Sequence, residues 1–239
     1  MKSLLPASLL VGLLLAPGFA LADAREDCQH GRGAQVRLRA CTEVIDKLAV
    51  SPEEKAVASR ARGLLRLDAG AVDDAIADFT RAIGLAPQDA QSYAGRARAR
   101  VVRGDLPGAI EDFTHAIRLA PDHASFLLGR GHVYFVRGEA QKAIEDFSAV
   151  IRLNPKSASA YNQRGLAYRR LGDIDRAIGD YTSAIDLNPV YALAYNNRGY
   201  AYEAQGRKPE AIADFKAALL LDASLVGARD GLARLGAAG

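Results

Sequence analysis

The segment that decides the fold reads ASAYNQRGLAYRRLGDIDRAIGDYTSAIDLNPVY and spans residues 158–191. Its one proline, Pro189, stands 34 residues after Pro155, and Pro121 and Pro87 precede at the same interval. Placing each proline at position 32 of a 34-residue unit divides much of the chain into consecutive units. The five units are residues 56–89, 90–123, 124–157, 158–191 and 192–225. A fixed period of this length predicts a repeat architecture.

Several positions hold the same type of residue in all five units. Position 15 is always glycine, which can take the left-handed conformation that ends a helix. Positions 20, 21, 24, 27 and 28 are apolar, and this spacing of three and four predicts the buried stripe of a second helix. Position 8 is small (Gly63, Ala97, Gly131, Gly165 and Gly199), and position 24 is aromatic (Phe79, Phe113, Phe147, Tyr181 and Phe215). Each unit is therefore predicted to be a helix–turn–helix with a ring packed between its helices.

These constant positions resemble those of the tetratricopeptide repeat (TPR) family over all five units. The resemblance implies an all-α fold, an α-solenoid wound as a right-handed superhelix, which serves as a binding scaffold. Four residues depart from the family pattern. Ser59 replaces a bulky residue, Arg66 and Arg100 replace tyrosine, and Ala223 replaces the last proline. We therefore expect the first two units to pack more loosely than the last three.

Residues 1–22 are predicted to be a cleaved signal peptide. Lys2 is followed by an uncharged stretch that reaches Ala22, and small residues at Ala20 and Ala22 suit a signal peptidase. The mature chain would begin at Asp23, or two residues later if cleavage follows Ala24. A retained membrane anchor is the less favoured alternative, because proline and glycine interrupt the stretch. We expect a periplasmic or secreted protein that does not insert into the membrane after cleavage.

The two cysteines, Cys28 and Cys41, lie just inside the predicted mature N-terminus. In an oxidising compartment this pair favours a disulfide. A metal site would need further ligands, and a catalytic dithiol normally has a closer pair. If Cys41 stands at position 24 of a degenerate leading unit, Cys28 stands at position 11, which faces it across the two helices. Residues 23–55 are thus interpreted as a stapled capping repeat, and residues 226–239 as a polar-backed closing helix.

A column of arginines at position 7 runs parallel to a column of aspartates at position 23. The arginines are Arg62, Arg96, Arg130, Arg164 and Arg198, and the aspartates are Asp78, Asp112, Asp146, Asp180 and Asp214. The arginines could form a ligand ladder. We favour bidentate ion pairs between the helices of each unit, because packing devices repeat with the period of the fold and ligand sites rarely do.

No pattern in the sequence predicts catalysis, a metal site or a cofactor. The four histidines, His30, His115, His123 and His132, have no metal-binding spacing. A formal net charge of only +3 gives no electrostatic signature of a nucleic-acid-binding protein. The chain is therefore predicted not to be an enzyme and to bind protein.

The candidate binding surface is the inner side of the first helices. In the family this face is built from positions 2, 5, 9, 12 and 13, which vary between the units here. The predicted partner-binding residues are Arg98, Leu128, His132, Phe135, Asn162, Arg169, Asn196 and Tyr200. The face is expected to be apolar in the first three units and polar in the last two. In the alternative, Val102 and Val136 pack against neighbouring units and leave little free apolar surface.

The favoured hypothesis is a periplasmic adaptor that binds a peptide or helix of a partner in this groove. A second hypothesis is self-assembly into homo-oligomers through the small residues that open each unit (Ala56, Ala90, Ala124, Ala158 and Ala192). A third is a non-catalytic regulator of a cell-envelope enzyme, which the sequence neither supports nor excludes.

Overall fold

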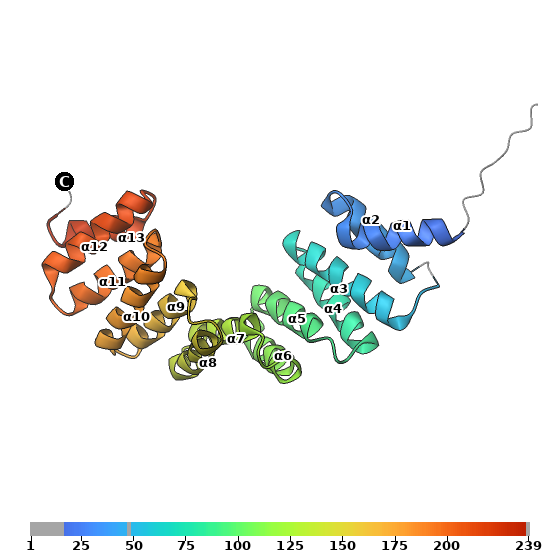
Figure 1. Ribbon diagram of the computed structural model, residues 1–239, viewed down its shortest axis with the longest axis horizontal. Helices are drawn as coiled ribbons and strands as arrows, with labels where there is room; N and C mark the ends of the chain where they lie inside the picture. The colour runs from blue at the N-terminus through green and yellow to red at the C-terminus, as the bar shows by residue number, and fades with distance from the viewer. Residues whose placement is uncertain (1–16, 47–48, 238–239) are drawn as a thin grey trace, which may run out of the picture. The chain divides into compact units, whose positions relative to one another are not determined.

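The computed structural model describes residues 17–46 and 49–237, and these form helices and connecting turns without a strand (Figure 1). The helices are α1 (Pro17–His30), α2 (Ala34–Asp46), α3 (Pro52–Asp68), α4 (Val72–Leu85), α5 (Ala90–Arg103), α6 (Leu106–Leu119), α7 (Ala124–Val136), α8 (Ala140–Leu153), α9 (Ala158–Arg170), α10 (Ile174–Leu187), α11 (Ala192–Ala204), α12 (Lys208–Leu221) and α13 (Val226–Arg234). The chain divides after Pro87 into two compact units, here called unit 1 and unit 2.

Unit 1 contains α1 to α4, which pack in consecutive pairs. A capping box starts α3: the Ser51 hydroxyl accepts a hydrogen bond from the Glu54 amide at 3.2 Å, and the Ser51 amide donates to the Glu54 carboxylate at 2.9 Å. Both orphan amides are thereby satisfied, and Pro52 follows where a missing N–H costs little. The core of unit 1 includes both cysteines, Val44 and Ile45.

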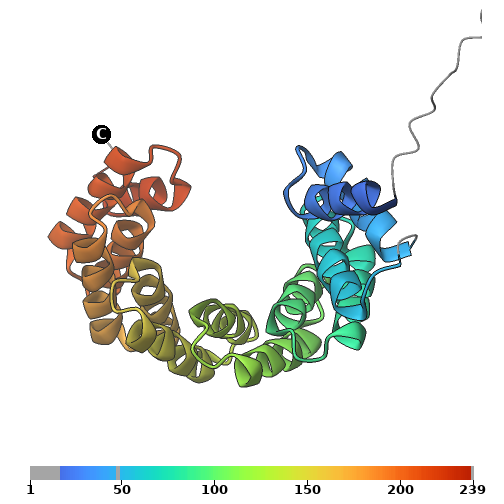
Figure 2. The ribbon, with the colours of Figure 1, turned by 45° about the vertical axis from the view of Figure 1, so that its right-hand side comes forward.

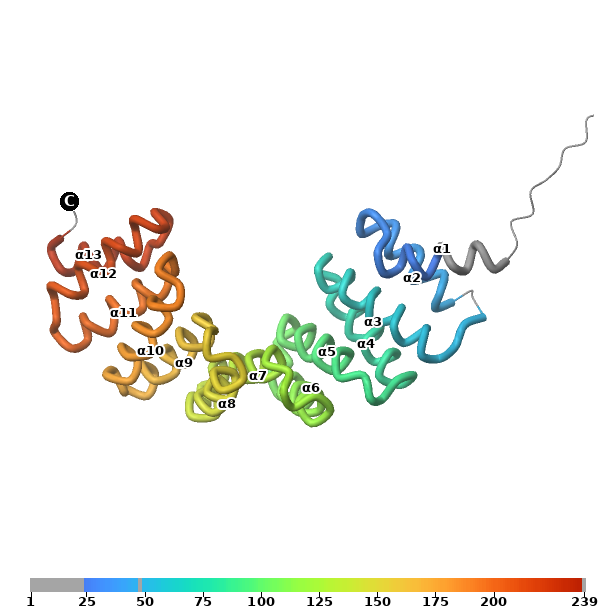
Figure 3. Tube along the Cα trace, viewed as in Figure 1, coloured from blue at the N-terminus to red at the C-terminus, as the bar shows by residue number. Residues whose placement is uncertain are grey.

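Unit 2 is a row of four helix pairs closed by α13 (Figure 3). The first helices α5, α7, α9 and α11 each contact the next first helix, and α11 contacts α13. Among the described residues, no Cα atoms of different second helices (α6, α8, α10 and α12) lie within 8 Å of one another. First helices that touch and second helices that splay apart give a curved row with the first helices inside, and Figure 2 shows this curvature from green to red. On the concave side of this curve, the first helices α5, α7, α9 and α11 face the solvent. We call this surface the inner face.

The residues at the constant positions of the repeat have the structural roles predicted for them. Gly104 and Gly138, both at position 15, have φ of 86°, the left-handed region that glycine favours. The rings at position 24 are enclosed, with Phe79, Tyr181 and Phe215 all 0% exposed. Burying such a ring removes a large apolar surface from water and anchors each helix pair.

The small residue at position 8 provides the space for that ring. A Cβ atom built on Gly131 would lie 2.8 Å from Cε1 of Phe147, inside van der Waals contact. Gly131→Ala is therefore expected to lower the free energy of unfolding by about 1–3 kcal/mol, as overpacking does. Gly179 is the matched control, because it also lies within a helix but a Cβ there meets nothing within 4 Å. Gly179→Ala should raise stability by about 0.5–1 kcal/mol. Urea unfolding measures both, and equal effects of the two substitutions would refute this explanation of position 8.

The sequence predicts a signal peptide at one end of the chain and a closing helix at the other. Most of the predicted signal peptide, residues 1–16, lies outside the described residues, and its predicted cleavage site falls inside α1. No helix in the described part of the chain is both long and apolar enough to span a bilayer. At the other end, α13 is the expected closing helix: Ala228 and Leu232 are buried, whereas Arg229 and Asp230 are exposed.

Candidate functional site

The arginine and aspartate columns form ion pairs within every repeat, as predicted. Arg130, for example, donates to the two carboxylate oxygens of Asp146 at 2.9 and 2.8 Å, and this hydrogen bonding raises the pKa of Arg130 above its ordinary value. The same two-pronged geometry joins Arg62 to Asp78, Arg96 to Asp112, Arg164 to Asp180, and Arg198 to Asp214. With their carboxylate partners built in, these arginines serve the fold.

A third contact of the same arginines ties successive repeats together. Nη1 of Arg130 donates to the Thr114 hydroxyl of the preceding second helix at 3.1 Å. Arg164 reaches Ser148 at 3.1 Å, and Arg198 reaches Thr182 at 3.0 Å. These hydroxyls all stand at position 25, a column whose role the sequence alone does not show. The guanidinium thus bridges three helices.

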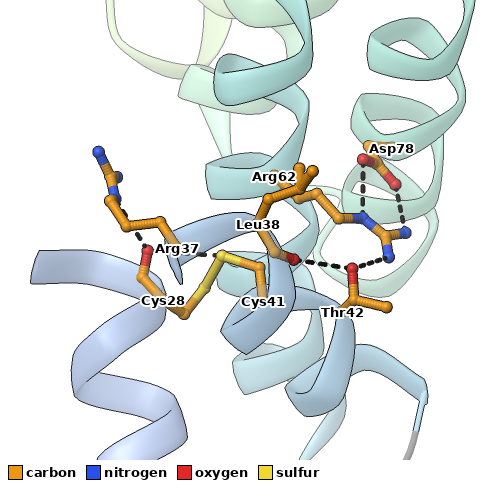
Figure 4. The surroundings of a disulfide bond; sticks show 7 residues. All are labelled: Cys28, Arg37, Leu38, Cys41, Thr42, Arg62 and Asp78. Carbon is orange, nitrogen blue, oxygen red and sulfur yellow. Dashed lines mark hydrogen bonds and ion pairs between the residues drawn. A yellow bond between two sulfur atoms is a disulfide. The ribbon is translucent and has the colours of Figure 1, made fainter. Parts of the chain in front are cut away.

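The predicted disulfide between Cys28 and Cys41 is present and joins α1 to α2 (Figure 4). Its cysteines are 2% and 0% exposed, so solvent is excluded from the bond. One residue after Cys41, the Thr42 hydroxyl accepts from Nη1 of Arg62 at 3.1 Å and donates to the Leu38 carbonyl at 2.8 Å. Thr42 therefore takes the role of the hydroxyls at position 25, and α1 and α2 act as a leading repeat in register with the rest.

The polar end of the predicted groove is largely used for packing within the chain. Asn162 is 4% exposed, and its side-chain oxygen accepts a hydrogen bond from Asn197 at 2.9 Å between α9 and α11. Asn196 is 9% exposed, and the Tyr200 hydroxyl donates to the carbonyl of Gly227 in α13 at 2.8 Å. From the sequence we expected these side chains on a free surface. Much of their surface instead faces neighbouring helices, including the closing helix.

Two guanidinium groups flank the Tyr200 ring. Arg169 lies 5.7 Å and Arg234 5.4 Å from the ring centroid, and Arg234 also grips the Glu203 carboxylate at 3.0 and 2.8 Å. Such contacts combine cation–π attraction with charge-assisted hydrogen bonds. The contacts of Arg234 fasten α13 to α11.

The hydrogen bonds from Arg234 lower the pKa of Glu203 below its ordinary value. A carboxyl group whose pKa is lower in the folded state than in the unfolded state stabilises the fold. This stabilisation is complete at pH values above the unfolded pKa, about 4.3, and it is lost as the pH falls through the folded pKa. Glu203→Gln should therefore lower the melting temperature slightly at pH 7 and leave it unchanged in strong acid. Thermal melts of both proteins from pH 7 to pH 2 measure this. A difference that persists undiminished in acid would contradict the role given to Arg234.

Exposed residues of the inner face lie on α5 and α7, and on α9 and α11, where Arg170 and Leu193 are exposed. Arg98 and His132 are exposed, and Val102 and Val136 are 65% and 50% exposed. Both valines are thus open to solvent and are not buried against the neighbouring repeats. Leu128, in contrast, packs partly against the core.

Phe135 and Arg170 meet between α7 and α9. The guanidinium of Arg170 lies 5.1 Å from the Phe135 ring centroid, and its Nη1 donates to the Phe135 carbonyl at 2.6 Å. The half-buried ring therefore stands beside a positive charge. Arg170 stands at position 13, one of the positions from which the inner face was expected to be built, although it is not among the predicted partner-binding residues.

Other parts of the described chain offer little chemistry. No group of three His, Cys, Asp or Glu side chains is placed there to hold a metal ion. A hollow of about 180 Å³ lies between α1, α2 and α3. It is lined by Arg25, Cys28, Gln29, Val44, Glu53, Glu54, Val57 and Ala58.

Comparison with known proteins agrees with the geometry. A Tetratricopeptide repeat profile matches residues 45–90 and 162–225, and a TPR repeat profile matches residues 131–172, so together they cover more than half of the chain. The chain belongs to the tetratricopeptide repeat family. Members of this family are generally non-catalytic interaction modules. A search of curated proteins gave no match.

Solved structures of TPR proteins are similar to this chain. A crystal structure of MamA protein shares 28% identity and a TM-score of 0.65, covering 71% of this chain and 93% of MamA. YrrB, a TPR protein with an unusual peptide-binding site, shares 20% identity and a TM-score of 0.62, covering 72% of this chain and 89% of YrrB. TTC0263 of Thermus thermophilus shares 23% identity and a TM-score of 0.58, covering 77% of this chain and 98% of TTC0263.

Proposed function

We propose that the mature chain is a periplasmic scaffold that holds a peptide or helix of a partner protein on the inner face of unit 2. The observation that carries this proposal is the exposure of Val102 and Val136, 65% and 50%, on successive first helices. Exposed apolar side chains on a rigid frame favour a binding surface. Phe135 with Arg170, and Arg98 with His132, add a ring and polar donors on α5, α7 and α9.

The fold is suited to this role. YrrB is a protein of the same fold that carries a peptide-binding site. In this chain the residues at the constant positions pack or pair with one another inside the fold. The side chains at the varying positions are therefore available to bind a partner.

The inner face is tested with a pair of matched double variants. Val102→Asp with Val136→Asp places two charges on the inner face. Leu153→Asp with Leu187→Asp places two charges at the ends of second helices, on residues that are also exposed, 42% and 40%. The immobilised proteins are compared in capture of partner proteins from a periplasmic extract. We expect the first variant to lose the partner that the wild type and the second variant retain. Equal capture by all three would overturn the inner face as the site.

Export rests on the features of residues 1–22. Amino-terminal sequencing of the protein from the periplasmic fraction is expected to give a chain that starts at Asp23, or at Arg25 after the alternative cleavage. Recovery of the intact chain only from the cytoplasm would overturn this part of the proposal.

Self-association is a second candidate, favoured by Leu220 and Val226, which are 89% and 61% exposed near the end of the chain. The alanines at position 1 are poor candidates for this contact, because Ala90, Ala124 and Ala158 pack against cores within the chain. Light scattering of the mature protein over a range of concentrations decides this, since a constant monomer mass would exclude it.

A further inference from the structure

Acidic residues are absent from three of the first helices of unit 2. The first helices α5, α7 and α9 contain eight arginines and no Asp or Glu: Arg96, Arg98, Arg100, Arg103, Arg130, Arg164, Arg169 and Arg170. The acids of these repeats lie on the second helices α6, α8 and α10, which include the aspartates of the ion pairs, and in the turns, as Asp105, Asp122, Glu139 and Asp173. A surface lined by one sign of charge attracts the opposite sign.

Three of these arginines have no acidic partner. Among the described residues, no Asp or Glu lies within ion-pair distance of Arg98, Arg169 or Arg170. In contrast, Arg100 is held by Asp112 at 2.9 Å. The acids that follow these helices are already paired: Asp105 with Arg100 and Arg103, and Glu139 with Arg137 and Lys142. On α11, Glu203 is bound by Arg234. The inner face from α5 to α9 is therefore positively charged.

The guanidinium group of Arg170 is held next to an apolar ring. Arg170 donates one N–H to the Phe135 carbonyl, and its guanidinium group lies beside the Phe135 ring. A guanidinium has five N–H donors, so donors remain for a carboxylate. Val136 and Val102 are the exposed apolar side chains on the neighbouring helices.

We infer, resting on the proposed function, that the bound segment is acidic. Its carboxylates meet Arg98, Arg169 and Arg170, and an apolar side chain between them packs on Val102 and Val136. Positive charge near an apolar strip selects this combination over neutral or basic segments, because like charges are repelled and the arginines gain carboxylate partners.

The test is a selection of random peptides, displayed on phage, on the immobilised mature protein. Arg98→Glu with Arg170→Glu reverses the charge of the inner face, and Arg118→Glu with Arg152→Glu is the control on exposed arginines of α6 and α8. Peptides enriched on the wild type should contain Asp or Glu beside apolar residues. They should bind the inner-face variant roughly tenfold or more weakly, and the control variant as well as the wild type. Circular dichroism melts check that each variant is folded.

Each remaining outcome overturns a distinct statement. If peptides enrich without acidic residues, yet lose binding in the Val102→Asp, Val136→Asp variant, the acidic partner is wrong and the binding face stands. If no enriched peptide depends on the inner face, both fail. Should the charge-reversed variant not fold, the salt dependence of the selected peptides on the wild type decides, with affinity expected to fall steeply as salt rises. Affinity that is independent of salt would overturn the acidic segment.

Discussion

Asp146→Ala is expected to destabilise unit 2 by about 3 kcal/mol, because it leaves the partly buried Arg130 without its carboxylate. The Asp146 and Arg130 side chains are 7% and 19% exposed, and two hydrogen bonds join them. Urea unfolding followed by circular dichroism measures the loss. Asp186→Ala, an exposed position of α10, is the control and should change stability by less than about 0.5 kcal/mol.

A second variant separates the pair from the loss of charge. Arg130→Met in the Asp146→Ala background removes the unpaired cation and should restore part of the stability, since an apolar replacement of a buried ion pair is often nearly neutral. Arg130 also bonds Thr114 of the preceding repeat, so restoration should be incomplete. A double variant less stable than Asp146→Ala alone would contradict this account of the column.

Cys28→Ser combined with Cys41→Ser is expected to lower the stability of unit 1 by about 3 kcal/mol, the value for a closed loop of this size. The bond spans 13 positions in sequence and joins the two helices of the leading repeat. Hydrogen exchange should show the largest loss of protection in α1 and α2, because repeats interact chiefly with their neighbours. Exchange in α11 and α12 is the internal control. Unchanged protection in α2 would show that the leading repeat does not depend on its disulfide.

The sequence was sufficient for the frame because each packing device occurs five times. The ring at position 24, the glycine at position 15 and the ion pair all recur once in every repeat. The structural role of each position can therefore be inferred from the residue type that recurs there. The hydroxyls at position 25 were equally visible, but their role appears only when the third donor of Arg130 is seen to reach Thr114.

The candidate site was harder to predict because it depends on which helix covers which side chain. Gly231 in α13 corresponds to Gly95 and Gly129 at position 6, and a Cβ on Gly231 would lie 2.5 Å from the Phe215 ring. α13 therefore acts as the first helix of a sixth repeat and covers part of Tyr200. That correspondence is present in the sequence, and it would have moved the predicted surface toward α5, α7 and α9.

The central claim, that a partner protein binds the inner face, is tested most directly by photo-crosslinking in cells. A photoreactive amino acid replaces His132 on α7 in one strain and Glu145 on α8 in another, and both positions are exposed. The account predicts a specific crosslinked partner from position 132 and none from position 145. A partner attached from position 145, with none from position 132, would contradict it.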